Sequence, residues 1–354
     1  MDIRGDKVKI LSNVVSSQVK IHRKYGGVVP EVAARKHAEV IFEVIGKALI
    51  SCQRDALTKL SKHPFDAIDL IAVTQGPGLV TSLRVGVLAA QALAALSKKP
   101  LVGVNHIEAH LFSPFLSCHC EPEGRGNPGE IASSSRKIGT PRKDIVFPTL
   151  GLIVSGGHTE LVLVKNFCKY EMIGSTRDDA VGEAFDKVAK MLGLSYPGGP
   201  TVSREAAKFH IPHSTSHIPK LPRPMLNSND FDFSFAGLKT AVLYLTKKMT
   251  LRELKKATPA ICAEFQKAAI EVLAYKTKRA AEKYRVKSIL VGGGVSANRE
   301  LRAALQKLDY PVFLPELQYT GDNAAMIAYA GYKKYQREKK NEVFSVAAEP
   351  NLVI

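Results

Sequence analysis

The chain has 354 residues with a hydrophobic share of 45%, which is enough for one large or two ordinary domains with a substantial core. Its 50 Lys and Arg residues outnumber 33 Asp and Glu residues, which gives a net charge of +17. This charge favours an anionic partner such as nucleic acid over the alternative that lysine-rich helices serve only to keep the protein soluble. Five scattered cysteines argue against a disulfide framework. No signal peptide opens the chain, and apolar runs such as residues 85–96 are too short and too rich in alanine to span a bilayer. A cytoplasmic protein is therefore expected.

The first predicted elements are a strand and a helix. Residues 7–15 are rich in Val and Ile and follow the turn Arg4-Gly5-Asp6. They are predicted to form the second arm of a hairpin whose first arm is not part of the sequence. A turn at residues 25–30 leads into a helix with Pro30 in its first position, and the apolar stripe within residues 40–49 is typical of a core-facing helix.

The next segments alternate between strand and helix. Residues 68–74 form a strand of the buried type that ends at Gly76-Pro77-Gly78, and a helix follows through Leu96. Residues 101–104 form another strand, which leads directly to two histidines. This order predicts a mainly parallel α/β sheet, whose ligands collect at the carboxyl ends of the strands.

His106 and His110 are spaced four residues apart, which places both imidazoles on one side of a helix. Asp322 is the candidate carboxylate for a site with two histidines and open positions, suited to Fe(II) or Zn(II). The pattern is short, and two ordinary helical histidines account equally well for the pair alone. Glu108 lies roughly 200° around the helix from either histidine, which argues against a zinc peptidase of the His-Glu-x-x-His type.

The later part of the chain begins with an irregular segment. Residues 118–144 are dense in Gly, Pro, Ser, Lys and Arg without apolar periodicity, which predicts a flexible insertion, either a solvated loop or a basic arm that contacts RNA. Strands at residues 148–155 and 160–164 then flank Gly156-Gly157 as a hairpin. Further elements are helices at 180–192 and within 251–284, a strand at 288–291, and helices from about Asn298 and from about Asp322 to Arg337.

Two glycine-rich junctions follow predicted strands, at residues 153–160 and 290–298. Glycines at a strand end let backbone N–H groups face an anion, and the second junction also precedes a helix. One such junction alone would indicate only a tight turn, whereas two indicate nucleotide phosphates, without matching a Walker or dinucleotide fingerprint. Between them, residues 177–190 form either a solvated helix with ion pairs or part of a ligand site, and the stiff turn at 196–200 favours a flat ligand.

Eight segments resemble, in the same order, motifs of the TsaD family, the bacterial-type tRNA threonylcarbamoyladenosine transferases once described as glycoproteases. The resemblance extends from about Val14 to Ala330. The matching segments are residues 74–78, 105–110, 154–160, 179–187, 196–200, 233–239, 292–298 and 321–325.

The resemblance implies an α/β fold of the actin-like/Hsp70-like ATPase (ASKHA) type, with two lobes and the site in the cleft between them. The first lobe would be residues 1–117 with 320–354 returning to it, and the second 145–319, with 118–144 inserted between them. The implied reaction transfers a threonylcarbamoyl group from threonylcarbamoyl-AMP to N6 of the adenosine 3′ to the anticodon of a tRNA. A scaffold of the same complex that binds nucleotide and metal without turnover is the alternative.

The resemblance also implies the site residues and partners. His106, His110 and Asp322 would hold one Fe(II) per chain, with Zn(II) as the alternative. Asp186 would accept from ribose hydroxyls and the glycine N–H groups would face phosphate, and no residue is assigned as the catalytic base. Partners would be tRNA, an inactive homologue that pairs through the first lobe, and an ATPase, without a membrane. The adenylate would be held by Ile153, Val154, Ser155, Gly156, Gly157, Asp186, Gly199 and Asn298.

The sequence departs from the family pattern in two places. Family members begin with a strand that carries a Glu-Thr-Ser-Cys-Asp type of motif near the phosphates, and this strand is expected to be missing here. A chain without it is expected to be less stable and less active, because a central sheet edge would be unpaired and ligands on the phosphate side would be absent. Ala109 also replaces a glycine that is common in the histidine motif.

Overall fold

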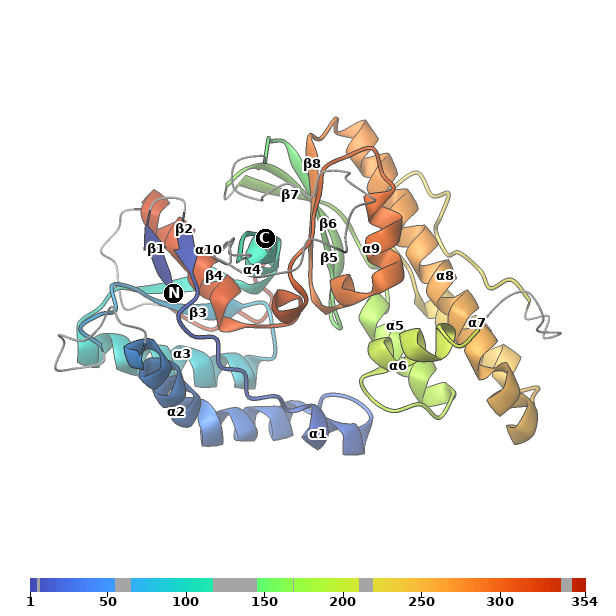
Figure 1. Cartoon of the computed structure of the whole chain (residues 1–354), viewed down its shortest axis with the longest axis horizontal. Helices are drawn as coiled ribbons and strands as arrows, with labels where there is room; N and C mark the ends of the chain where they lie inside the picture. Colours follow the sequence, from blue (N-terminus) through green and yellow to red (C-terminus); the bar gives the residue numbers. More distant parts are fainter. Residues whose placement is uncertain (5–6, 55–64, 117–144, 168, 210–218, 339–345) are drawn as a thin grey trace, which may run out of the picture.

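The computed structural model describes residues 1–354 except 5–6, 55–64, 117–144, 168, 210–218 and 339–345 (Figure 1). The described residues form a mixed α/β protein with strands in three separate groups. In chain order the elements are β1 (Asp2–Arg4), β2 (Lys7–Lys9), α1 (Val19–His22), η1 (Arg23–Tyr25), α2 (Pro30–Arg54), β3 (Ile71–Gly76), α3 (Val80–Ser97), β4 (Leu101–Asn105), α4 (His106–Phe112), η2 (Ser113–Leu116), β5 (Thr149–Val154), β6 (Thr159–Asn166), β7 (Lys169–Ser175), α5 (Val181–Met191), α6 (Gly198–Ala206), α7 (Ala236–Thr246), α8 (Leu251–Lys283), β8 (Ser288–Gly292), η3 (Gly294–Ala297), α9 (Arg299–Gln306), β9 (Val312–Phe313), η4 (Leu317–Tyr319) and α10 (Ala324–Glu338).

The N-terminal residues form a hairpin within the sequence itself. β1 pairs antiparallel with β2, with Ile3 opposite Val8. The prediction that the first arm of this hairpin lies outside the sequence is therefore wrong, and the strand predicted at residues 7–15 ends at Lys9. The Val and Ile content was misleading because Ile10 packs against a hydrophobic cluster without forming ladder hydrogen bonds.

β3 and β4 form a parallel pair that is covered by helices on both faces. Ala72 of β3 lies against Gly331 of α10, whereas the next residue, Val73, lies against Gly86 of α3. Since successive side chains of a strand point to opposite faces, α3 and α10 sandwich this pair. α10 thus returns to the N-terminal part of the chain, and Lys334 Nζ donates to Gly103 O at 2.9 Å.

Among the described helices, α3 alone has the length and composition to cross a membrane, with 18 residues and a mean hydropathy of 1.5. The prediction that the apolar run at residues 85–96 is too short is wrong on length, because the helix already begins at Val80. α3 nevertheless covers a sheet, since Leu83, Val87 and three alanines are buried against β3 and its neighbours. Leu88 and Leu96 on its outer side stay exposed.

The largest group, called the second sheet below because it follows the β3–β4 pair, has five strands in the order β7-β6-β5-β8-β9. β5, β8 and β9 run parallel, whereas β6 is antiparallel to both β5 and β7. The prediction of a mainly parallel sheet is therefore wrong for the side that carries β6 and β7. Short connections after Val154 and Asn166 join these strands, and short connections can join only antiparallel neighbours.

β5 is buried on both faces, which explains its unbroken hydrophobic run. Leu152 belongs to the large core that the sheet forms with α5, α7, α8 and α9. Ile153 faces the opposite side, where it packs with Ile107 and Leu111 of α4. Figure 1 shows α5 to α9 gathered on one side of the sheet, with α4 on the other. The helix that carries both histidines is thereby pressed against the second sheet.

The structure confirms the predicted helices at α2, α3, α5, α8, α9 and α10 and the β5–β6 hairpin, with ends that differ by a few residues. The sequence analysis did not predict α1, β7, α6, α7 and β9. α6 was interpreted as a turn because it opens with Gly198-Gly199-Pro200, but a proline is tolerated in the first turn, where backbone N–H groups have no partner in the helix. The predicted insertion at residues 118–144 lies outside the described residues.

Candidate metal and nucleotide site

The transition from β4 to α4 places the two histidines. Asn105 ends the strand, and its side-chain Oδ1 accepts hydrogen bonds from the backbone N–H groups of Ile107 at 2.8 Å and Glu108 at 3.2 Å. This cap starts the helix at His106 and puts His110 one turn further along. The prediction that a strand delivers both histidines to one side of a helix is confirmed.

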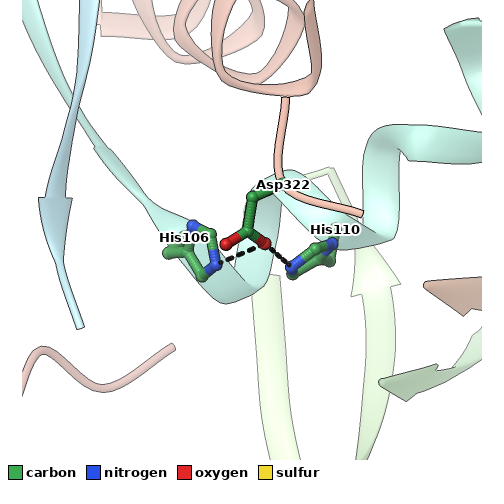
Figure 2. Close-up of side chains that lie close together, drawn as sticks. All are labelled: His106, His110 and Asp322. Atoms are coloured by element: carbon green, nitrogen blue, oxygen red, sulfur yellow. Dashed lines mark ion pairs between the residues drawn. The ribbon is translucent and has the colours of Figure 1, made fainter. Parts of the chain in front are cut away.

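Asp322 reaches the histidines from the loop before α10 (Figure 2). Its Oδ1 lies 3.3 Å from His106 Nε2 and 3.2 Å from His110 Nε2. Asn323 holds the loop, because its Oδ1 accepts from Met326 N at 3.0 Å. One ligand atom from each of the three residues lies within 4.8 Å of the others, so the structure brings together the predicted metal-binding set.

The donor set fits a metal ion. His110 is only 1% exposed, yet neither of its ring nitrogens has a hydrogen-bond partner among the described residues. Its Nε2 lies 3.2 Å from Asp322 Oδ1, so the two atoms are close enough to bind one cation together. Leaving a buried polar atom without a partner is costly. Two imidazoles and a carboxylate suit a cation such as Fe(II) or Zn(II) at that position.

The electrostatics keep these groups in forms that bind metal. Burial lowers the pKa of His110, against the opposing effect of Asp322. Desolvation raises the pKa of the Asp322 carboxyl, but its side chain is largely exposed and the imidazoles of His106 and His110 outweigh the effect, so its pKa lies below the usual value. A neutral imidazole and an ionised carboxylate are the states that coordinate a metal.

Glu108 is directed away from the cluster. Its Oε1 accepts a hydrogen bond from Tyr170 OH of β7 at 2.6 Å. Its carboxylate is therefore occupied on the side of α4 that faces the sheet. This position agrees with the argument from spacing against a peptidase in which the glutamate acts beside the metal.

The two glycine junctions are neighbours in space. β5 and β8 are adjacent parallel strands, with Ile153 opposite Gly292, so both junctions lie at the same carboxyl edge. Gly293 has a φ of +89°, and a Cβ there would come 2.3 Å from Val154 O. Only glycine fits this contact.

In the turn after β5, unlike at Gly293, glycine is not required by a close contact. Ser155 N donates to His158 O at 2.8 Å and closes the turn. A Cβ built at Gly156 or Gly157 would meet no atom within 4 Å, and neither residue has a positive φ. Packing and backbone conformation therefore do not require glycine at these two positions. Open backbone at a strand end is what a phosphate group needs to approach N–H groups closely.

Asp186, Gly199 and Asn298 converge on the start of α6. Asp186 Oδ1 accepts from Gly198 N at 2.6 Å. Asn298 Nδ2 donates to Ser203 Oγ at 3.0 Å, and that hydroxyl lies 2.9 Å from Gly199 O. Burial raises the pKa of Asp186, against the hydrogen bond from Gly198. The three predicted residues thus form one group, through contacts that link α5, α6 and α9.

α5 connects this group to the turn after β5. Gly182 N at the start of α5 donates to Ser155 O at 3.1 Å, and Asp186 follows one turn later on the same helix. The predicted adenylate residues therefore lie along one continuous set of contacts. Ile153 and Val154 differ from the rest, because their side chains are fully buried on opposite faces of β5 and only their backbone can contribute.

The sequence analysis gave no role to three residues of this site. Ser203 and Gln266 both hydrogen bond to Asn298 Nδ2, and no motif marked them. His158 follows the turn at Gly156-Gly157; burial, and then the charges of the nearby His106 and His110, lower its pKa to about 4. The signal for His158 was its place next to Gly156-Gly157, in a turn already assigned to a ligand.

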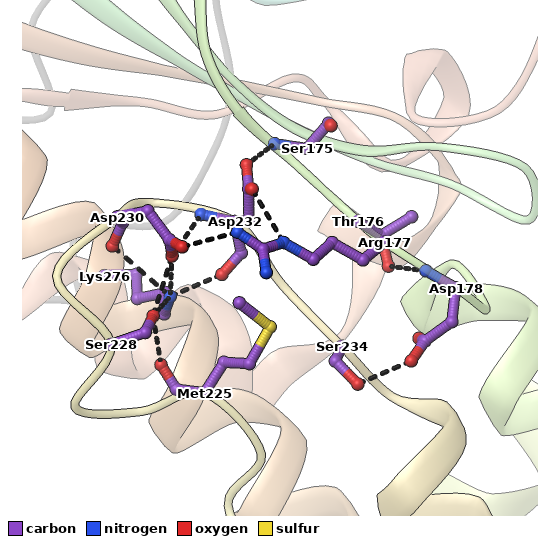
Figure 3. A network of polar contacts seen from close by, with 10 residues as sticks. All are labelled: Ser175, Thr176, Arg177, Asp178, Met225, Ser228, Asp230, Asp232, Ser234 and Lys276. Atoms are coloured by element: carbon purple, nitrogen blue, oxygen red, sulfur yellow. Dashed lines mark hydrogen bonds and ion pairs between the residues drawn. The ribbon is translucent and has the colours of Figure 1, made fainter.

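A separate polar network orders the chain after β7 (Figure 3). Lys276 of α8 is fully buried, and its Nζ donates to Ser228 Oγ at 2.7 Å and lies 3.4 Å from Asp230 Oδ1. Arg177 donates to Asp230 Oδ2 at 2.7 Å and to Asp232 Oδ2 at 2.9 Å. Since its charges are paired with one another, we assign this network a structural role beside the site.

Known proteins of one family match nearly the whole length of this chain. A family model described as TsaD, tRNA N6-adenosine threonylcarbamoyltransferase, matches residues 9–128 and 130–329. A relative from Thermosipho africanus (strain TCF52B) is 42% identical over 356 residues, covering 98% of this chain and 94% of the relative. One from Bacillus cereus (strain ATCC 14579) is 42% identical, covering 98% and 90%, and one from Syntrophomonas wolfei is 43% identical, covering 94% and 88%. All three are named tRNA N6-adenosine threonylcarbamoyltransferase.

Proposed function

Because the chain belongs to the TsaD family of tRNA N6-adenosine threonylcarbamoyltransferases, we propose that the metal cluster and the glycine-lined turns form one active site. The protein is a transferase of tRNA modification that places a threonylcarbamoyl group on N6 of an adenosine. We infer that this adenosine is the one 3′ to the anticodon and that the donor is threonylcarbamoyl-AMP. The observation that carries the site is the position of buried His110, whose ring nitrogens have no hydrogen-bond partner among the described residues, beside Asp322.

The proposed architecture is the two-lobed actin-like/Hsp70-like ATPase (ASKHA) fold. Residues 1–117 with 320–354 form the first lobe and residues 145–319 the second. The return of α10 to β3 and β4, after the chain has completed the second sheet, supports this division. α4 and the Asp322 loop then lie where the two lobes meet, which is where ligands bind in folds of this kind.

The adenylate donor is proposed to lie along the contacts of α5. The turn at Gly156 and Gly157 leaves its backbone open to the phosphate, which approaches the N–H group of Gly156, whereas the N–H groups of Ser155 and Gly157 donate within the turn. Asp186 is placed to accept from the ribose hydroxyls, because its Oδ1 already receives the N–H of Gly198 and a second oxygen remains. Ile153 and Val154 contribute through their backbone at the end of β5. Asn298 holds α6 through Ser203, whose hydroxyl also donates to Gly199 O.

The metal ligands are proposed to be His106, His110 and Asp322, with Fe(II) as the ion and Zn(II) as the alternative. When bound, such an ion supplies a Lewis acid that polarises a carbamoyl or phosphate oxygen. N6 of the adenosine forms the new bond to the threonylcarbamoyl carbonyl carbon while that carbon's bond to the AMP phosphate oxygen breaks, so AMP leaves and N6 loses one proton. The residues of the chain hold the two reactants in line, and no residue is assigned as the base for that proton.

The first lobe also presents a surface for a protein partner. α2 and α3 pack side by side, and both carry exposed apolar side chains, namely Phe42, Ile50, Leu88 and Leu96. Single exposed apolar residues are ordinary, but two neighbouring helices that both expose large ones indicate an interface. We propose that an inactive homologue of this chain covers this face and that an ATPase helper completes the complex, in the cytoplasm.

Reconstitution tests the proposal. Purified protein, threonylcarbamoyl-AMP, unmodified tRNA and the helper proteins are combined, and modified adenosine is quantified by mass spectrometry of tRNA digests. The wild-type chain is expected to modify tRNA, and Asp322→Asn to lose most of the activity. Wild-type protein that binds metal and adenylate yet modifies no tRNA would favour the scaffold alternative instead.

A further inference from the structure

A short basic segment of the N-terminal part touches the loop that opens α6. Arg23 of η1 donates from Nε to the carbonyl oxygen of Tyr196 at 3.2 Å. Lys190 of α5 approaches the same segment, since its Nζ lies 3.5 Å from the position of a Cβ at Gly26. Figure 1 shows α1, which η1 continues, beside α5 and α6. Cations from two distant stretches of sequence thus meet next to Gly198 and Gly199.

The segment has a defined shape. His22 is buried, its Nδ1 accepts from Val29 N at 3.3 Å, and its Nε2 lies 3.1 Å from Gln18 Oε1. Gly26 ends η1 in the left-handed region with a φ of +71°. These contacts fix the backbone of η1, while the side chains of Lys24 and Tyr25 are exposed. Tyr25 is 56% exposed.

The cations of the segment lack anionic partners. Among the described residues, no ion pair involves Arg23, Lys24 or Lys190. Like charges held close together repel, so an anion that binds between them is attracted by all of them and relieves the repulsion. An exposed tyrosine beside cations is the combination that holds single-stranded nucleic acid, since the ring stacks on a base while the cations bind phosphates.

We propose that Arg23, Lys24, Tyr25 and Lys190 bind the tRNA strand that flanks the target adenosine. Lys24 and Lys190 take phosphates, and Tyr25 stacks on a neighbouring base. Arg23 keeps its hydrogen bond to Tyr196 and directs its remaining N–H groups to the same strand. This inference rests on the proposed function, because it assumes that an adenosine must enter beside the start of α6.

A second basic surface provides the matched comparison. The junction of α7 and α8 carries exposed Lys255 and Lys256 together with Tyr244, which is 62% exposed. Its composition resembles that of the η1 segment, so a general attraction to RNA would use both. In Figure 1 the start of α8 and α1, which η1 continues, lie on opposite sides of α6. Of these two surfaces, η1 is the one that contacts the loop before α6.

The experiment compares two sets of variants in the complete, metal-loaded complex. The first set is Tyr25→Ala and the double variant Lys24→Ala/Lys190→Ala, and the control set is Tyr244→Ala and Lys255→Ala/Lys256→Ala. Steady-state modification of tRNA gives kcat and KM, and tRNA binding is measured against salt concentration. Affinity for an AMP analogue and melting temperature check that the adenylate site and the fold are intact. All substituted side chains are exposed, so folding is expected to be unaffected.

Tyr25→Ala is expected to raise the KM for tRNA about tenfold with little change in kcat, because no ring remains for the base to stack on. The double lysine variant is expected to reduce the slope of log affinity against log salt by about 0.7 to 0.9 for each phosphate that is no longer bound. The control set should change neither quantity. Unchanged tRNA kinetics in the η1 variants, or a loss of tRNA binding in the control set alone, would overturn the proposal that η1 binds tRNA. In both cases an active wild-type complex would leave the proposed transferase function intact. A wild-type complex that modifies no tRNA would instead refute the proposed function.

Discussion

The carbonyl oxygen of His110 lies where a side chain at Gly292 would begin, 2.4 Å from the position of a Cβ. The helix that carries the candidate metal ligands therefore rests directly on the end of β8. The glycine junction that follows β8 lies beside the turn at Gly156 and Gly157, since β5 and β8 are neighbours. The metal cluster and the candidate phosphate turn are thus coupled through backbone contacts.

Gly292→Ala is expected to push α4 away from β8 and to disturb the metal cluster. The overlap is with backbone, so neither residue can relieve it by a rotamer change, and the cost is roughly 1–3 kcal/mol of unfolding free energy. Metal content and urea denaturation would both report the effect. Gly294→Ala is the control, because its Cβ would meet no atom within 4 Å. Equal metal content in both variants would contradict the coupling.

The wild type is expected to bind a near-stoichiometric amount of metal, and His110→Ala is expected to lose it. Three ligands from the protein hold the ion in the proposed site, and removing a buried one leaves only His106 and Asp322. Metal analysis of the purified variant and of the wild type measures the effect. His158→Ala is the comparison, since His158 lies near the cluster but outside the ligand set. Metal loss in His158→Ala alone would show that the set is wrong.

Asp186→Ala is expected to weaken binding of an adenylate analogue about tenfold to a hundredfold, the range for a hydrogen bond to a charged group. Calorimetry gives the affinity. Asp186→Asn separates two effects, because its amide oxygen can still accept from Gly198 N and keep α6 in place. If Asp186→Asn binds as tightly as the wild type, the carboxylate holds α6 and does not contact ribose.

Glu160 is expected to make stability depend on pH. Burial raises its pKa from 4.5 to about 7, and its Oε2 has no hydrogen-bond partner among the described residues. The protonated form therefore stabilises the fold. This contribution is complete below about pH 4.5 and is lost as the pH rises through 7, and it amounts to about 3 kcal/mol.

Glu160→Gln, which stays neutral, should remove this pH dependence, so that its advantage over the wild type grows between pH 5 and pH 8. Urea denaturation at both values measures the difference. Glu171→Gln on the neighbouring strand replaces an exposed carboxylate and serves as control. Parallel stability curves for wild type and Glu160→Gln would show that the carboxylate is solvated.

The sequence predicted the elements whose patterns are local. The helical stripe of α2, the strand before His106 and the glycines after β5 and β8 all have signals within a few residues. The positions of His106 and His110 on one helix followed from spacing alone. Asp322 was named as the candidate carboxylate, but its contact with the two histidines did not follow from spacing, because a contact between α4 and the loop before α10 depends on how the chain packs.

Other parts of the site could not be predicted for a physical reason. Gly198 and Gly199 were interpreted as a turn, yet they open α6, because Asp186 accepts the N–H of Gly198 from another helix. Ser203 and Gln266 hold Asn298 through hydrogen bonds between elements that are distant in sequence. Such partners carry no periodic or spacing signal, and their roles emerge only in three dimensions.

The loop that carries Asp322 comes late in the chain, after the whole second sheet and its helices. A growing polypeptide therefore exposes His106 and His110 long before their carboxylate partner exists. Domains of a nascent chain fold from the N-terminus as they emerge, but this centre cannot close until the last helix has left the ribosome and crossed back to β3 and β4. Capture of an ion by the proposed ligand set would thus be one of the final events in the biogenesis of the protein, and a chain cut short before Asp322 would lack the carboxylate of that set.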